Sequence, residues 1–136
     1  MKKTRFIPIY NSKGGSNLAF ARGKSGVYLI KHKDTNQIVY IGYSATQLED
    51  TITRHFREWK DKRQIRVSYR DRTAYSVRIV FCTTARAEAL ERALILQIQP
   101  KDNPDKLRLH LLTQGEKNAL STYESIDITP VEDLPF

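Results

Sequence analysis

Apolar residues along the chain fall into short stretches whose spacing predicts secondary structure. Residues 26–32 and 38–42 are runs of β-favouring residues on either side of the polar cluster 34–37, a pattern typical of an antiparallel hairpin. Residues 75–82 alternate between polar and apolar at first and then become continuously apolar, which predicts another strand. The runs together predict a small antiparallel sheet.

Two longer stretches have helical periodicity. Residues 47–60 and 86–99 each place their apolar residues on a single stripe, which predicts two amphipathic helices. The first stripe consists of Leu48, Ile52, Phe56 and Trp59. The second consists of Ala87, Leu90, Leu94 and Ile98. Pro100 ends the second helix, because proline cannot continue it.

The remaining segments lie at the two ends of the sequence. Residues 1–24 are basic and rich in small residues, so we expect an irregular N-terminal arm. Residues 105–136 contain a weak apolar segment and then an acidic tail, which indicates a C-terminal extension. The order hairpin, helix, strand, helix predicts an α+β fold with a small three-stranded antiparallel sheet flanked by helices.

The charge of the chain is high and unevenly distributed. The net charge is +8, with 22 Lys and Arg against 10 Asp and Glu in residues 1–115, and one lysine against five acids in residues 116–136. A basic body of this kind is typical of a protein that binds a polyanion, because Lys and Arg release counterions from phosphates. A basic surface that is simply solvated is the alternative on charge alone.

The cysteine count and the hydropathy of the chain restrict the cellular compartment and the partners that we expect. Cys82 is the only cysteine and has no partner within the chain, which fits a reducing compartment, and we expect a cytoplasmic protein. No stretch approaches the ~20 apolar residues of a membrane span, so no membrane partner is expected. Cysteine pairs and histidines at ligand spacing are lacking as well, and a zinc site is therefore not indicated.

The predicted hairpin carries a pair of tripeptides, Gly26-Val27-Tyr28 in its first strand and Tyr40-Ile41-Gly42 in its second. The pair resembles the signature of the GIY-YIG nuclease superfamily. Further along, Glu91 lies in the second predicted helix, Pro100 ends that helix and Asn103 follows, as in the excision-repair nuclease domains of this family. The resemblance covers residues 25–104 and leaves the arm and the extension outside it.

The resemblance implies a metal-dependent endonuclease that hydrolyses DNA. Glu91 would bind one divalent cation, Mg²⁺ or Mn²⁺, because such a hard cation needs few protein ligands besides waters and phosphate oxygens. Tyr28 would act as general base or water orienter, and Tyr40 as its supporting partner. A tyrosine with its usual pKa near 10 needs a nearby cation to accept a proton at neutral pH.

The first predicted helix supplies the remaining family residues. Arg54 would stabilise the transition-state phosphate, and His55 would bond to the phosphate or assist Tyr28. In the family an arginine usually lies four residues before the His/Tyr position, and that position is Thr51 here. On a helical wheel, Arg54 lies about 60° from Thr51, on the side away from the apolar stripe and towards solvent. This departure leaves a catalytically weakened or inactive DNA-binding module as the alternative function.

The glycines Gly26 and Gly42 and the amide of Asn103 would support the site from behind, with Asn103 fixing the loop after the helix. Without the resemblance, each of these residues also fits a structural role. Glu91 and Arg54 fit surface charges, and the tyrosines and His55 fit half-buried strand and helix residues.

A basic stretch between the first helix and the last strand fits a DNA backbone. It is interleaved with aromatic residues, and its alternative is a solvated loop over residues 61–74. The predicted DNA-binding residues are Arg57, Lys60, Lys62, Arg63, Arg66, Arg70 and Arg72. DNA is therefore the expected partner. The sequence also allows a homodimer or a protein partner. It allows, too, a protein-interaction role in which the acidic tail masks the basic body.

Overall fold

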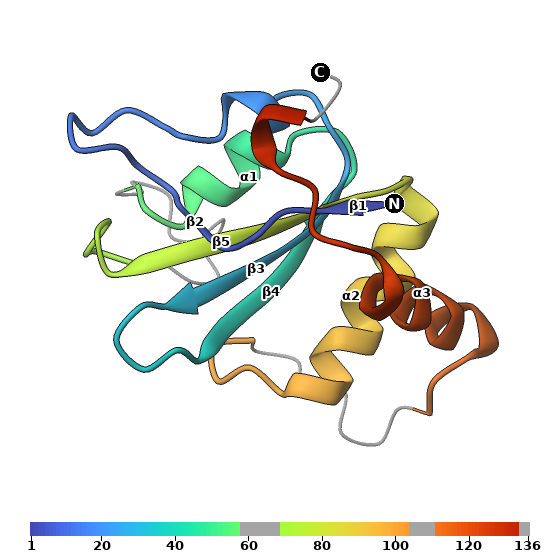
Figure 1. The fold of residues 1–136 in the computed structure, drawn as a ribbon. Helices are drawn as coiled ribbons and strands as arrows, with labels where there is room; N and C mark the ends of the chain where they lie inside the picture. Colours follow the sequence, from blue (N-terminus) through green and yellow to red (C-terminus); the bar gives the residue numbers. More distant parts are fainter. Residues whose placement is uncertain (58–68, 104–110, 134–136) are drawn as a thin grey trace.

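The computed structural model describes residues 1–57, 69–103 and 111–133, and its centre is an antiparallel β-sheet (Figure 1). The strands follow the order β1-β5-β3-β4, and β2 also pairs with β5. Their bounds are Lys2–Lys3 (β1), Ile7–Pro8 (β2), Gly26–His32 (β3), Ile38–Ser44 (β4) and Tyr75–Phe81 (β5). The helices are Leu48–Arg54 (α1), Thr84–Ile98 (α2) and Gln114–Ser125 (α3), with short 3-10 helices at Ala19–Ala21 and Val131–Asp133. The predicted α+β class is confirmed.

The sheet has five strands where the sequence predicted three, and the expected irregular arm supplies the other two. Lys2 pairs with Phe81 and Ile7 pairs with Val77, so β1 and β2 run along the free side of β5. Two-residue strands are too short to show a period of two, which is why the pattern did not predict them. Residues 1–24 are thus part of the packed structure and not an arm.

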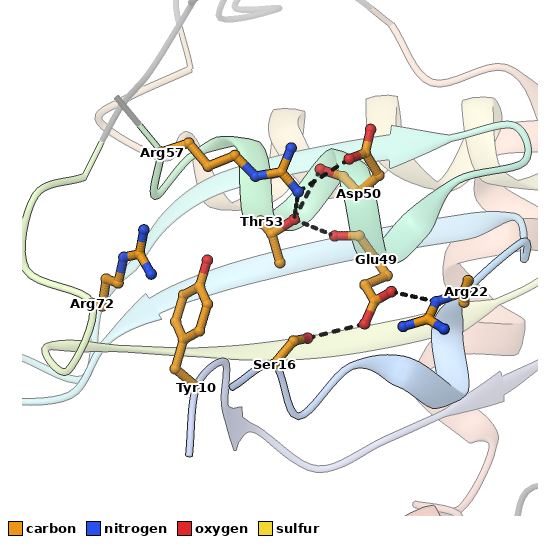
Figure 2. Close-up of a pocket in the computed structure, with 8 residues that line it drawn as sticks. All are labelled: Tyr10, Ser16, Arg22, Glu49, Asp50, Thr53, Arg57 and Arg72. Atoms are coloured by element: carbon orange, nitrogen blue, oxygen red, sulfur yellow. Dashed lines mark hydrogen bonds and ion pairs between the residues drawn. The ribbon is translucent and has the colours of Figure 1, made fainter. Parts of the chain in front are cut away.

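The helices cover the two faces of the sheet, α1 on one and α2 with α3 on the other (Figure 1). The N-terminal segment, residues 1–24, first adds β1 and β2 to the sheet and then passes onto the α1 face, where it contributes Ile9 and Leu18 to the core. A groove opens between this segment and α1 (Figure 2). The other core joins Val27 and Leu29 of the sheet to Leu90 and Leu94 of α2.

Helix α1 is shorter than the predicted 47–60. It ends at Arg54, and the backbone N–H groups of His55, Phe56 and Arg57 bond to carbonyls three residues back, which tightens the chain into a turn. The Thr53 hydroxyl donates to the Glu49 carbonyl one turn earlier, a contact known to bend helices. Trp59 of the predicted stripe lies outside the described residues.

Helix α2 starts two residues earlier than predicted and ends at Ile98, after which Gln99 adopts a left-handed backbone conformation before Pro100. Helix α3 was not predicted. It begins with a capping box in which the Thr113 hydroxyl accepts from the Glu116 N–H and the Glu116 carboxylate accepts from the Thr113 N–H. Glu116, counted with the acidic tail, is therefore buried at a helix start. Within the described part of the chain no helix has the length and apolar character to span a membrane.

Candidate active site

The hydroxyl of Tyr28 is the centre of a buried polar cluster on the α1 face. Tyr28 lies in the middle of β3, and its oxygen is 2.9 Å from Nε2 of His55, just after α1. The Tyr40 ring stacks beside Tyr28 at 6.1 Å between centroids and lies 4.6 Å from the His55 ring. The sheet and the end of α1 thus bring three of the predicted site residues together.

Gly42 makes room for this cluster. Antiparallel pairing sets Gly42 of β4 directly opposite Tyr28, and a Cβ atom at Gly42 would overlap the Tyr28 ring and hydroxyl. Gly26 serves the packing of the sheet itself, because a Cβ there would overlap the carbonyl oxygen of Val80 on β5. Each glycine therefore allows a close approach that another residue would block.

Asn103 secures the outer edge of β4. The Ile41 N–H donates to Asn103 Oδ1 at 2.9 Å, and Asn103 Nδ2 donates to the Ile41 carbonyl at 2.8 Å. Strand β4 is the last strand of the sheet order, so these backbone groups face away from β3 and would otherwise lack a strand partner. Ile41 lies between Tyr40 and Gly42, so Asn103 holds the strand segment that carries the site.

Glu91 of α2 is half-buried, beside the buried stripe of that helix. Burial, then the neighbouring Tyr40 and then the charge of Glu91 raise the pKa of Tyr28 well above its usual value. The carboxylate is therefore close enough to act electrostatically on the hydroxyl. In the free protein Tyr28 stays neutral at physiological pH, since a buried phenolate near a carboxylate is disfavoured.

The donor set fits a hard divalent cation bound by one carboxylate. Among residues 1–57, 69–103 and 111–133 there is no group of three or more His, Cys, Asp and Glu that could hold a metal ion by itself. Mg²⁺ keeps several waters and combines one or two carboxylates with phosphate oxygens, so Glu91 with a DNA phosphate matches its chemistry.

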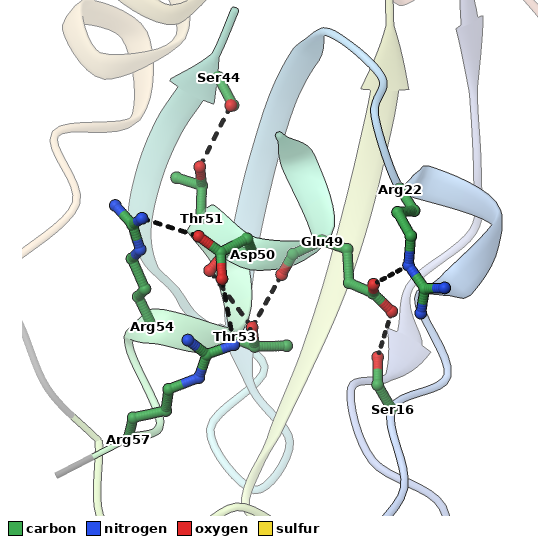
Figure 3. A network of polar contacts seen from close by, with 9 residues as sticks. All are labelled: Ser16, Arg22, Ser44, Glu49, Asp50, Thr51, Thr53, Arg54 and Arg57. Carbon is green, nitrogen blue, oxygen red and sulfur yellow. Dashed lines mark hydrogen bonds and ion pairs between the residues drawn. The ribbon is translucent and has the colours of Figure 1, made fainter. Parts of the chain in front are cut away.

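Arg54 lies on the exposed side of α1. Its guanidinium forms an ion pair with Asp50 one turn earlier, at 2.8 Å (Figure 3). At the position where the family usually has arginine, the Thr51 hydroxyl donates to the Ser44 hydroxyl at 3.1 Å, at the end of β4. The helix thus directs Thr51 towards the sheet and Arg54 towards an acidic neighbour.

The predicted DNA-binding residues divide into two groups. Arg57, Arg70 and Arg72 are exposed, and Arg57 also pairs with Asp50 at 3.2 Å. Four predictions fall outside the described residues: Lys60, Lys62, Arg63 and Arg66.

Tyr69 is a neighbour of the site that the sequence did not reveal. Its ring lies 6.3 Å from the His55 ring, and its backbone N–H donates to the His55 carbonyl. Its hydroxyl donates to Asp102 Oδ2 at 2.8 Å, next to Asn103. Burial, with the Asp102 hydrogen bond second, raises the pKa of Tyr69. Only its place among basic residues was visible in the sequence, and that suggested a DNA-facing side chain.

Comparison with protein families gives a match over residues 24–104, more than half of the chain, to the GIY-YIG catalytic domain. Comparisons with curated proteins and with solved structures give no match. The matched segment runs from just before β3 to just after Asn103, and so contains Tyr28, Tyr40, His55 and Glu91. The family is one of nuclease domains that act on DNA, which indicates a nuclease-type function. The chain belongs to the GIY-YIG catalytic-domain family.

Proposed function

We propose that this protein is a divalent-metal-dependent endonuclease that hydrolyses DNA phosphodiester bonds, with Glu91 as the ligand of Mg²⁺ or Mn²⁺. The observation that carries the proposal is the contact of Tyr28 with His55 and Tyr40, in a place where the charge of Glu91 raises the pKa of Tyr28. A hydroxyl and an imidazole are in contact there, and a carboxylate of α2 acts on the hydroxyl electrostatically, which are the groups that phosphodiester hydrolysis requires.

Tyr28 has the role of holding the attacking water. When Nε2 of His55 accepts a hydrogen bond, the Tyr28 hydroxyl donates to it, and the lone pairs of the Tyr28 oxygen are left to accept a hydrogen bond from the water. As the water attacks, its proton passes to the Tyr28 oxygen while the proton of Tyr28 passes to Nε2 of His55. The Tyr40 ring fixes the orientation of both partners by packing on them. Glu91 would hold the divalent cation, which would supply positive charge to the phosphate oxygens and lower the pKa of nearby groups.

Arg54 has the role of a charged donor to the phosphate. Its guanidinium is planar and carries five N–H donors, so it can turn from Asp50 to the phosphate when DNA binds. Asp50 then serves to hold the side chain in one region of α1 before the substrate arrives.

A plasmid-nicking assay tests the proposal. Wild type, Glu91→Gln and the control Glu88→Gln are compared in Mg²⁺, Mn²⁺ and EDTA. Glu88 is exposed on the same helix, so its substitution makes the same change of charge away from Tyr28. We expect nicking by wild type and Glu88→Gln with metal only, and a loss of about 100-fold or more in Glu91→Gln. Equal nicking by Glu91→Gln would refute its role as the metal ligand.

A DNA-binding module that has lost catalysis is the second candidate. It is favoured by Thr51, which bonds to Ser44 at the usual arginine position, and by the ion pair that holds Arg54 on Asp50. This candidate predicts salt-sensitive DNA binding by wild type and Glu91→Gln alike, with no nicking in any metal. The same assay, run beside a binding measurement, therefore separates the two functions.

A further inference from the structure

The groove between the N-terminal segment and α1 has a volume of about 330 Å³ and is open to solvent (Figure 2). Tyr10 lines it from the segment, Thr53 from α1, Arg57 from the turn after α1, and Arg72 from just before β5. Its size lies at the lower end of the roughly 300–1,000 Å³ of small-ligand sites, room for one nucleotide unit. Tyr10, Ser16 and Arg22 lie outside the family match, so one wall of the groove comes from residues that the match does not cover.

Arg57 is held in place on one side of the groove. One terminal nitrogen, Nη2, donates to the Thr53 hydroxyl at 2.9 Å and lies 3.2 Å from the Asp50 carboxylate. A guanidinium has five N–H donors, and these two contacts use a single nitrogen. The remaining donors are therefore positioned by contacts that already exist, and little entropy is lost when they bind an anion.

Arg72 lies at the same end of the groove as Arg57 and is held by a ring (Figure 2). Its guanidinium carbon lies 4.7 Å from the centroid of the Tyr10 ring, in cation–π contact. Tyr10 in turn packs edge-to-face on Phe56 at 5.9 Å, which fixes the ring. Stacking occupies the face of a guanidinium and leaves its in-plane N–H donors available. Among the described residues no carboxylate forms an ion pair with Arg72.

Two carboxylates line the groove, and both already have cationic partners. Glu49 pairs with Arg22 at 2.8 Å and accepts from the Ser16 hydroxyl. Asp50 is shared between Arg54 and Arg57 (Figure 3). Three arginines, Arg22, Arg57 and Arg72, therefore line the groove with two acids, and the excess positive charge lies on the side of Arg57 and Arg72. An anion is the ligand that this excess favours.

The groove and the candidate active site meet at the end of α1. His55 contacts Tyr28 and Tyr40, while the next residue, Phe56, contacts Tyr10. A helix with its side chains is about 10–12 Å across, and one strand of B-DNA advances about 3.4 Å per nucleotide. A strand bound at Tyr28 therefore reaches the groove within a few nucleotides.

We propose that this groove binds a backbone phosphate of the same DNA strand that enters the active site, through Arg57 and Arg72 with Tyr10 as the platform for Arg72. The inference rests on the proposed nuclease function and adds a second place where the protein binds its DNA substrate. The N-terminal segment is then part of the DNA-binding surface, and the phosphate lies a few nucleotides from the bond to be cut.

Fluorescence anisotropy with a labelled DNA duplex in EDTA, across a series of KCl concentrations, tests the inference without requiring cleavage. Each phosphate contact contributes about 0.9 to the slope of log affinity against log salt concentration. We expect Arg72→Ala to lower this slope by about 0.9 and to weaken binding about eightfold at 0.1 M salt. Lys117→Ala removes an exposed cation from α3, on the other face of the sheet, and is the control.

Substitutions of Tyr10 test whether the aromatic platform under Arg72 contributes to DNA binding separately from the positive charge of the groove. Tyr10→Leu leaves every charge in place but removes the platform, so we expect weaker binding, with Tyr10→Phe, which keeps the ring, binding more tightly than Tyr10→Leu. Thermal unfolding of each variant shows whether it is folded. If folded Arg72→Ala has the slope of Lys117→Ala, the groove does not bind a phosphate. That result can occur in a protein that nicks, so the inference can fail while the nuclease function stands. If the protein never nicks DNA but Arg72→Ala shows the expected change of slope, the groove binds a phosphate and the nuclease function fails.

Discussion

The side chain of Asn103 binds both backbone groups of Ile41, accepting from its N–H at 2.9 Å and donating to its carbonyl at 2.8 Å. The amide thus takes the place that a further strand would occupy beside β4. Because Ile41 lies between Tyr40 and Gly42, a distant loop residue controls the shape of the strand that carries the candidate site.

We therefore expect Asn103→Ala to lower the free energy of unfolding by roughly 2–4 kcal/mol, since two hydrogen bonds are lost and two buried backbone groups lose their partner. Asn103→Asp should be no better, because a carboxylate oxygen would then face the Ile41 carbonyl. Urea denaturation measures both. Asn118→Ala, at an exposed position of α3, is the control and should change stability by less than about 0.5 kcal/mol. A neutral Asn103→Ala would contradict this role.

Gly42→Ala tests the close approach of Tyr28. The added methyl group would overlap the Tyr28 ring and hydroxyl, so we expect a loss of roughly 1–3 kcal/mol and a displaced Tyr28 that no longer supports nicking. In a Tyr28→Ala background the additional cost of Gly42→Ala should vanish, because the overlapping group is gone. Calorimetry of the four proteins gives the coupling. Gly115→Ala, at a position without close neighbours, should not destabilise the protein.

Arg54→Ala tests whether this arginine serves the reaction or only the surface of α1. If Arg54 turns to the phosphate, single-turnover nicking should fall about 100-fold in the variant. Thr51→Arg in the same background places a guanidinium at the usual family position and should recover part of the rate. Unchanged nicking in Arg54→Ala would remove Arg54 from the site and leave it as the partner of Asp50.

The raised pKa of Tyr69 predicts a loss of stability at alkaline pH. In the unfolded chain Tyr69 loses its proton near pH 10, whereas the native protein retains it. The unfolded state therefore binds fewer protons above pH 10, and the free energy of unfolding falls by about 1.4 kcal/mol per pH unit from this group. Thermal unfolding between pH 9 and 11 should show a shallower decline in Tyr69→Phe. An unchanged pH dependence would contradict the shift.

Local pattern was sufficient for β3, β4, β5 and α2, because each strand contains a run of β-favouring residues and the helix has its apolar residues on one stripe. The resemblance led to Tyr28, Tyr40 and His55, and the structure brings these residues together. The helical wheel also placed Arg54 towards solvent, where it meets Asp50. In these cases the information lies within one element or one short motif.

Contacts between segments that lie far apart in the sequence could not be predicted from local pattern. The residues around Ile7 do not indicate that β5 has a free edge with which they pair, and the residues around Tyr69 do not indicate its contact with Asp102. Helix α3 is a different case, since Thr113 and Glu116 form a capping box whose residues are three positions apart and are therefore visible in the sequence. The groove at Tyr10 likewise depends on segments that only the fold brings together.

The pairing of Lys2 with Phe81, and of Lys3 with Ile128, determines when the first strand can join the sheet during synthesis of the chain. A protein leaving the ribosome can form only those contacts whose two halves have already been synthesised. The strand with the lowest residue numbers must wait for β5, and its other neighbour is made later still. Closing this edge of the sheet therefore requires long loops to be ordered, a slow step. Until then the core residues of the N-terminal segment are without their partners, and a chaperone would have most to protect at that stage.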